Sequence, residues 1–218
     1  MSYTIPMSLW NTFISFIFPE TCILCRNEGS VLCEQCLEYL PLFPHSPHDF
    51  IYPLFSYQDK KVRTVIHALK YNHAHSIIPI ITPILHEIVQ DILMHSITLS
   101  SGQIYIIPVP DMKKHTRARG TNHVRKIAKS LQQCNPSNYI LLDSCIIRIN
   151  TTSQRDLSRK DRLTNMYDGF KVIDSNTLIN KNILIIDDVC TTGSTLMSLR
   201  KECLNAGARK VIALVLAH

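Results

Sequence analysis

The stretch NILIIDDVCTTGSTLMSL, residues 182–199, decides the fold of this chain. An apolar run leads to Asp187 and Asp188, a short loop of Thr, Gly and Ser follows, and a helical pattern begins after the loop. Near-continuous apolar runs are typical of strands covered on both faces of a parallel sheet. The stretch therefore predicts a buried strand, a tight loop and a helix. The two carboxylates fall at the carboxyl end of the strand, where ligands bind in open α/β sheets.

The loop between this strand and this helix has the composition of a phosphate-binding site. A helix N-terminus offers backbone N–H groups and a partial positive charge, and Gly193 lets the backbone approach an anion. The two carboxylates could accept hydrogen bonds from vicinal hydroxyls of a ribose, so a sugar with a 5′-phosphate would satisfy both halves. The alternative is that the hydroxyl residues only cap the helix. The residues of the predicted phosphosugar site are Asp187, Asp188, Val189, Cys190, Thr191, Thr192, Gly193, Ser194 and Thr195.

Two other nucleotide-binding classes lack their signatures in this chain. A P-loop requires G-x-x-x-x-G-K-[ST], and none of the 6 glycines is followed by Lys. A dinucleotide-binding fold requires G-x-G-x-x-G, which is also absent. The sequence therefore argues against a nucleotide triphosphatase and against a dinucleotide-dependent enzyme.

Strand and helix patterns alternate along the rest of the chain. Apolar runs predict strands over 103–109, 139–149, 182–189 and 208–217. Helical spacing predicts helices over 62–71, 76–94, 121–134 and 194–207. Strand, helix and strand joined by short links indicate an α/β protein with a parallel sheet flanked by helices.

The segment 41–53 carries four prolines and no helical period, so it predicts a linker with a domain boundary near residue 45. Residues 1–44 would hold an amphipathic N-terminal helix and a cysteine module, and 45–218 the α/β domain. With separate cores, loss of the module would leave the α/β domain largely intact.

Four cysteines form the pattern C-x2-C-x7-C-x2-C before this linker. Each C-x-x-C pair can place two thiolates on one metal ion, and four sulfurs complete a tetrahedron without an open position. The spacing predicts a structural zinc site whose metal folds the module. The alternatives are an iron–thiolate site, a redox pair or disulfides. The predicted ligands are Cys22, Cys25, Cys33 and Cys36.

Paired C-x-x-C spacing is typical of metal binding in an intracellular chain. The first twenty residues lack Lys, Arg and a small-residue cleavage site, and no run of 18 apolar residues suggests a membrane span. We therefore expect a cytoplasmic protein.

Positive charge is concentrated in one region of the chain. Residues 111–171 hold 13 Lys and Arg against 5 Asp and Glu, a local charge of +8, whereas the whole chain carries +6. Such a region suits a polyanion, either a pyrophosphate group or a nucleic-acid backbone. The alternative is a solvated basic face without a ligand.

The strand-end acids followed by T-T-G-S-T resemble the phosphoribosyl pyrophosphate signature of the type I phosphoribosyltransferases. With the cysteine module, the chain resembles the ComF family of competence-associated proteins over roughly residues 20–217. Thr121 and His123 stand where family members usually have an aromatic residue and Gln, so no family role is carried over to them. The other stretches that carry the resemblance are ALKY at 68–71, IIPVP at 106–110, RARGTNHV at 117–124 and TTSQRDLSRKDRLTN at 151–165.

This resemblance implies a type I phosphoribosyltransferase-like domain over 45–218 that binds phosphoribosyl pyrophosphate with Mg²⁺. It implies pentosyl transfer as the reaction, and an association with competence and DNA uptake. A non-catalytic phosphosugar sensor, or a protein that binds single-stranded DNA or competence proteins, is the alternative. The implied catalytic residues are Asp187, Asp188, Lys113, Arg117 and Arg119. The residues expected in a closing lid are Arg155, Arg159, Lys160 and Arg162.

Overall fold

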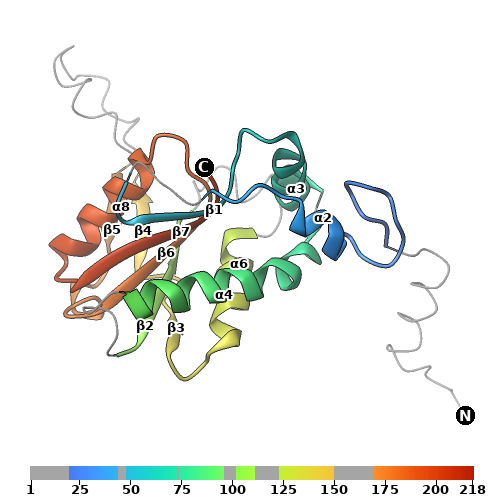
Figure 1. Cartoon of the computed structure of the whole chain (residues 1–218). Helices are drawn as coiled ribbons and strands as arrows, with labels where there is room; N and C mark the ends of the chain where they lie inside the picture. Colours follow the sequence, from blue (N-terminus) through green and yellow to red (C-terminus); the bar gives the residue numbers. More distant parts are fainter. Residues whose placement is uncertain (1–19, 44–47, 73, 96–101, 111–122, 150–168) are drawn as a thin grey trace, which may run out of the picture.

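The computed structural model describes residues 20–43, 48–72, 74–95, 102–110, 123–149 and 169–218. Within these residues, five parallel strands form the central sheet in the order β1-β7-β6-β2-β3 (Figure 1). The strands are β1 (Ile51–Phe55), β2 (Ile104–Pro108), β3 (Tyr139–Leu141), β6 (Asn182–Val189) and β7 (Lys210–Ala217). The predicted parallel sheet is confirmed.

Helices cover both faces of this sheet (Figure 1). One face packs against α3 (Lys60–Tyr71), α4 (Ile77–His95) and α6 (His123–Cys134). The other packs against α8 (Ser194–Asn205) and a two-stranded antiparallel sheet of β4 (Ile146–Ile149) and β5 (Gly169–Val172). A short helix, α2 (Glu34–Glu38), belongs to the cysteine module. The predicted helices over 62–71, 76–94, 121–134 and 194–207 all form, with ends displaced by a few residues.

The central strand β6 shows why its sequence is apolar throughout. It pairs with β7 on one side and β2 on the other. Leu184 and Ile186 pack toward α3, α4 and α6, whereas Ile183 and Ile185 pack toward α8. Because side chains alternate between the two faces of a strand, Asp187 and Asp188 must leave the end of β6 on opposite faces.

The connections around β2 and β6 diverge. The chain runs from β2 through α6 outward to β3, and from β6 through α8 in the opposite direction to β7. Strands β2 and β6 are hydrogen-bonded neighbours, so the direction of winding switches between them. In open α/β sheets, ligands bind in the crevice beyond the carboxyl ends of the strands at such a point. The fold therefore places the ends of β2 and β6 at the expected ligand site.

Helix α4 continues through Pro83 even though proline removes one backbone hydrogen bond. The hydroxyl of Thr82 donates to the carbonyl of Ile78 at 2.6 Å and shares a hydrogen bond of 2.9 Å with Ser130 on α6.

Among the described residues, α4 is the one helix long and apolar enough to cross a membrane. Its buried side chains, which include Leu85 and Val89, pack in the core, so we describe it as a core helix.

Two expectations about element boundaries are wrong. The single strand predicted over 139–149 is two strands in different sheets. Strand β3 ends before Leu142, whose N–H donates to the carbonyl of Ile106, and the polar residues Asp143 and Ser144 follow. The predicted linker over 41–53 contains the start of β1. Pro53 is tolerated there because β1 is the edge strand of the parallel sheet, where a missing N–H leaves no ladder bond unmade.

The cysteine module shares its core with the α/β domain, contrary to the expectation of separate cores. Leu32 and Leu40 are buried in the same cluster as Leu54 and the inner side chains of α3 and α4. The N–H of Phe43 donates to the carbonyl of Leu54 at 3.0 Å, so the end of the module runs along β1. The boundary near residue 45 falls at 44–47, outside the described residues, and stays a prediction.

Candidate functional site

The strand, loop and helix predicted over 182–199 form a small cavity at the carboxyl end of β6. Asp187 and residues 189–196 line this cavity, whose volume is about 50 Å³. One water needs about 10–15 Å³ of such space, so the cavity has room for several waters or for a small anion in their place. The first N–H groups of α8 have no partner within the helix. An anion in the cavity would meet these donors at the positive end of the helix dipole.

Gly193 holds the backbone at the start of α8 in a conformation that other residues rarely adopt. Its φ angle is +74°, in the left-handed region. A Cβ atom at this position would lie 2.7 Å from Nε2 of His48 and 3.3 Å from Cδ1 of Ile51. The loop thus requires glycine for two reasons, its dihedral angle and the packing of His48 against it.

Asp187 faces this cavity from the α8 side of the sheet. Its Oδ1 accepts the N–H of Asp188 at 2.9 Å. Burial and the neighbouring charge of Asp188 raise the pKa of Asp187 to about 7, although the charges of Lys70 and Arg148 act in the opposite direction. Near neutral pH this carboxyl group is therefore partly protonated, and a protonated carboxyl group can donate a hydrogen bond to a ligand oxygen.

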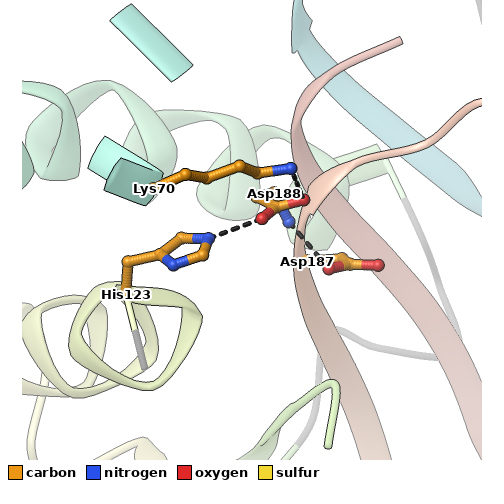
Figure 2. A network of polar contacts seen from close by, with 4 residues as sticks. All are labelled: Lys70, His123, Asp187 and Asp188. Carbon is orange, nitrogen blue, oxygen red and sulfur yellow. Dashed lines mark hydrogen bonds and ion pairs between the residues drawn. The ribbon is translucent and has the colours of Figure 1, made fainter. Parts of the chain in front are cut away.

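Asp188 faces the opposite side of the sheet, toward α3 and α6 (Figure 2). Lys70 at the end of α3 places Nζ 2.9 Å from Oδ1, and His123 at the start of α6 places Nε2 2.5 Å from Oδ2. Burial alone would raise the pKa of Asp188, but the hydrogen bond from His123 and the charge of Lys70 outweigh it and lower the pKa. Asp188 is therefore a stable carboxylate with two cationic or donor partners.

The structure separates two side chains that the sequence treats as a pair. In Figure 2 the carboxyl group of Asp187 points away from the cluster of Lys70, His123 and Asp188. A ribose that contacts Asp187 from the cavity does not contact Asp188 in the same orientation. The two acids hence have different environments and different protonation at neutral pH.

Three residues of this site were not proposed for it from the sequence: Lys70, His123 and Arg148. Lys70 lies in the ALKY stretch at 68–71 and His123 in the RARGTNHV stretch at 117–124, and the resemblance gave neither residue a role. Arg148, on β4, is near enough to lower the pKa of Asp187. These residues come from α3, α6 and β4, and only the fold brings them to the end of β6.

The predicted basic residues lie outside the described residues: Lys113, Arg117, Arg119, Arg155, Arg159, Lys160 and Arg162. Their positions along the chain are nevertheless bounded. Residues 111–122 join the end of β2 to the start of α6, so both ends of this segment lie at the switch point. Residues 150–168 join β4 to β5, whose ends pair at Ile149 and Gly169. Their roles stay predictions.

A larger cavity of about 730 Å³ lies between α4 and the edge strand β1. Its charged side chains are Asp49, Glu87 and Asp91, which would repel a phosphate group. We therefore assign the candidate phosphosugar site to the smaller cavity at the end of β6, beside the N-terminus of α8.

The four cysteines of the N-terminal module come together as predicted. Their Sγ atoms all lie within 4.8 Å of one another, and those of Cys25 and Cys33 are 3.7 Å apart. A tetrahedral zinc ion with Zn–S bonds of about 2.3 Å requires S···S distances of about 3.8 Å. Burial raises the pKa of Cys22, but the N–H groups of Cys25 and Cys33 contribute to lowering it to about 6. The four sulfur atoms therefore fit a tetrahedral zinc ion in geometry.

Part of the chain is similar in sequence to a curated competence protein. No protein-family model matches the chain. Over 108 residues it is 31% identical to Competence protein F of Haemophilus influenzae, which covers 49% of this chain and 46% of that protein. The chain thus spans about half the length of this curated relative. The match confirms the resemblance to the ComF family seen in the motifs.

Solved structures of phosphoribosyltransferases are similar to part of the chain. Glutamine phosphoribosylpyrophosphate amidotransferase of Bacillus subtilis has a TM-score of 0.40 at 13% identity, over 65% of this chain and 26% of that chain. A hypoxanthine phosphoribosyl transferase of Trypanosoma cruzi has a TM-score of 0.39 at 11% identity, over 65% of this chain and 64% of that chain.

Proposed function

We propose that this protein binds phosphoribosyl pyrophosphate together with Mg²⁺ at the carboxyl end of β6, as a phosphoribosyltransferase-like protein associated with DNA uptake. The observation that carries the proposal is the loop from Cys190 to Gly193, with its left-handed glycine and the small cavity under the N-terminus of α8. The match to Competence protein F and the charge of residues 111–171 support the association with DNA uptake. The expected location is the cytoplasm.

Each part of the site has a distinct task in this proposal. The N–H groups of the loop and the first turn of α8 bind the 5′-phosphate. Asp187, partly protonated near neutral pH, hydrogen-bonds the ribose hydroxyls. The proposal assigns binding of the pyrophosphate to Lys113, Arg117 and Arg119, and the role of a closing lid to Arg155, Arg159, Lys160 and Arg162. Mg²⁺ would be held mostly by the oxygens of the substrate and would neutralise charge on the pyrophosphate leaving group.

In a transferase reaction, the bond between C1 of the ribose and the pyrophosphate breaks while an acceptor attacks, and positive charge develops on the ribose. A carboxylate near the ring stabilises that charge. Asp188 remains ionised, but Lys70 and His123 already neutralise it. The electrostatic stabilisation that Asp188 can offer to a positive charge on the ribose is consequently weak.

This neutralisation favours a second candidate function, a sensor that binds the phosphosugar without transferring it. Phosphoribosyl pyrophosphate labelled in the ribose, incubated with the protein, Mg²⁺ and a panel of bases, distinguishes the two. Transfer of label to any base establishes a transferase, and binding without pyrophosphate release establishes a sensor.

The phosphate cradle itself is tested by substitution. Gly193→Val should lower the affinity for ribose 5-phosphate and for phosphoribosyl pyrophosphate alike, by at least tenfold, because the side chain cannot fit against His48 and Ile51. Calorimetry at constant Mg²⁺ measures both affinities.

Gly102→Val is the matched control for this substitution. Gly102 also has a positive φ angle, but it lies before β2 and a Cβ atom there meets nothing within 4 Å. The control should bind both ligands as the wild type does. Wild-type protein that gives no heat with substrate and Mg²⁺ would contradict the proposed function.

A further inference from the structure

His48 contacts the phosphate loop from a segment that lies far away in the sequence. Its Nε2 is 3.3 Å from the carbonyl oxygen of Thr192, 144 residues further along the chain. The same ring packs so closely on Gly193 that a Cβ atom there would lie 2.7 Å from Nε2 and 2.9 Å from Cδ2. Thus one side chain contacts both residues of the peptide unit that leads into α8.

The geometry of a peptide unit gives this contact a consequence. A trans peptide is planar, so its carbonyl and its N–H point in opposite directions. Because the carbonyl of Thr192 points toward His48, the N–H of Gly193 points away from His48. That N–H is directed at Cys190, whose pKa is raised by burial and by the charge of Asp187 and lowered by this hydrogen bond. Cys190 and Gly193 both line the cavity.

The backbone of His48 is tied to the start of β1. Its carbonyl accepts the N–H of Ile51 at 3.1 Å, at the start of β1. The next residues are fixed as well: the carbonyl of Phe50 accepts the N–H of Ala213 on β7 at 2.7 Å, and the guanidinium of Arg200 on α8 lies 4.8 Å above the Phe50 ring. His48 therefore stands on the edge of the sheet, while the loop that it contacts extends from the centre of the sheet.

We infer that His48 is a positioning residue of the phosphate loop: by donating a hydrogen bond to the carbonyl of Thr192, it fixes the peptide unit that leads into α8 and so the shape of the loop that lines the cavity. The inference rests on the proposed function for the identity of the ligand. It adds that the beginning of β1 determines the phosphate affinity of a loop at the end of β6.

Two substitutions separate the hydrogen bond from the packing. His48→Gln keeps an N–H donor of similar reach, and His48→Leu fills similar space without a donor. We expect amide hydrogen exchange in residues 190–196 of the ligand-free protein to accelerate in His48→Leu and to stay near the wild-type rate in His48→Gln. Affinity for phosphoribosyl pyrophosphate with Mg²⁺ should fall about three- to tenfold in His48→Leu, the effect of one hydrogen bond, and should recover in His48→Gln.

A double substitution tests the packing against Gly193. Gly193→Ala places a Cβ atom against His48, whereas in a His48→Ala background this atom meets only Ile51 at 3.3 Å. The loss of affinity caused by Gly193→Ala should therefore be smaller in the His48→Ala background than in the wild type. Equal losses in both backgrounds would show that His48 does not shape the loop.

The two proposals fail in different ways. If wild-type protein binds no phosphoribosyl pyrophosphate, the proposed function is wrong, and the exchange rates in the ligand-free protein still decide the role of His48. If the wild type binds but His48→Leu shows neither faster exchange in the loop nor weaker binding, the positioning role is wrong and the proposed function stands.

Discussion

At the scale of single residues, Asp187 and Asp188 differ because they leave one strand on opposite faces. Asp188 meets Lys70 and His123, which lower its pKa. Burial of Asp187 and the charge of its neighbour raise its pKa to about 7. Adjacent identical residues thus act as a permanent carboxylate and as a group that titrates near neutral pH.

The raised pKa of Asp187 predicts how stability depends on pH. In the unfolded chain its carboxyl group loses the proton near pH 4, whereas the folded protein keeps the proton until about pH 7. The folded state binds the extra proton, so its stability should fall as the pH rises from 4 to 7, by up to about 4 kcal/mol.

Asp187→Asn removes this titration. Its free energy of unfolding in urea should depend less on pH between 5 and 7.5 than that of the wild type, and above pH 7 the variant should be the more stable protein. Both proteins carry the same cysteine module, so effects of pH on the module cancel in the comparison. Identical slopes for the two proteins would show that Asp187 is ionised throughout this range.

At the scale of elements, the end of β6 is where α3 and α6 meet the sheet. The last turn of α3 supplies Lys70 and the first residue of α6 supplies His123, and both bind Asp188 (Figure 2). Their side chains are only 25% and 17% exposed, so these contacts are more shielded from water than a surface ion pair. These contacts link α3 and α6 to the end of β6.

Lys70→Met should destabilise the protein by about 1–3 kcal/mol, a value between those of surface and fully buried pairs, because Asp188 loses one of its two partners. Arg125→Met is the matched control: it breaks the ion pair between Arg125 on α6 and Asp143, in which Arg125 is 59% exposed. The control should lose less than about 1 kcal/mol. Urea denaturation at pH 7 compares the two, and equal losses would count against a special role for the Lys70 contact.

At the scale of the whole molecule, the cysteine module and the α/β domain are packed as one body. Leu32 and Leu40 of the module lie in the core cluster that includes Leu54 of β1 and the inner side chains of α3 and α4. Folding of the module therefore contributes directly to the stability of the sheet, although the sequence separates the two by a proline-rich segment.

Removal of metal should accordingly destabilise the α/β domain as well as the module. Exposure of two buried leucines costs about 3–6 kcal/mol at most. A chelator should therefore lower the urea concentration at which the sheet is half unfolded, as measured by circular dichroism. Cys33→Ser should have the same effect, whereas Cys134→Ser, at an exposed cysteine of α6, should leave the midpoint unchanged. If the module unfolds and the urea midpoint of the sheet does not change, the module and the α/β domain have independent cores.

Local sequence determined the parts of this protein whose cause is local. The apolar run of β6, the loop up to Gly193 and the start of α8 follow from neighbouring residues, and so does the four-cysteine cluster, because each C-x-x-C pair lies within one short turn. The parallel sheet follows from the alternation of such units. Strand β1 and the division of residues 139–149 between two sheets did not follow, because an edge strand with a proline and a short polar break carry weak local signals.

Only the tertiary structure decided what surrounds the two aspartates and the loop. Lys70, His123, Arg148 and His48 reach the end of β6 from four different segments, and their side chains give no local signal of where they will lie. The shared core of the module and the sheet was also decided by the tertiary structure. Leu32 and Leu54 are apolar, but only the packing of whole elements brings them into one core. Contacts between distant segments depend on how whole elements pack, and neighbouring residues along the chain do not encode that arrangement.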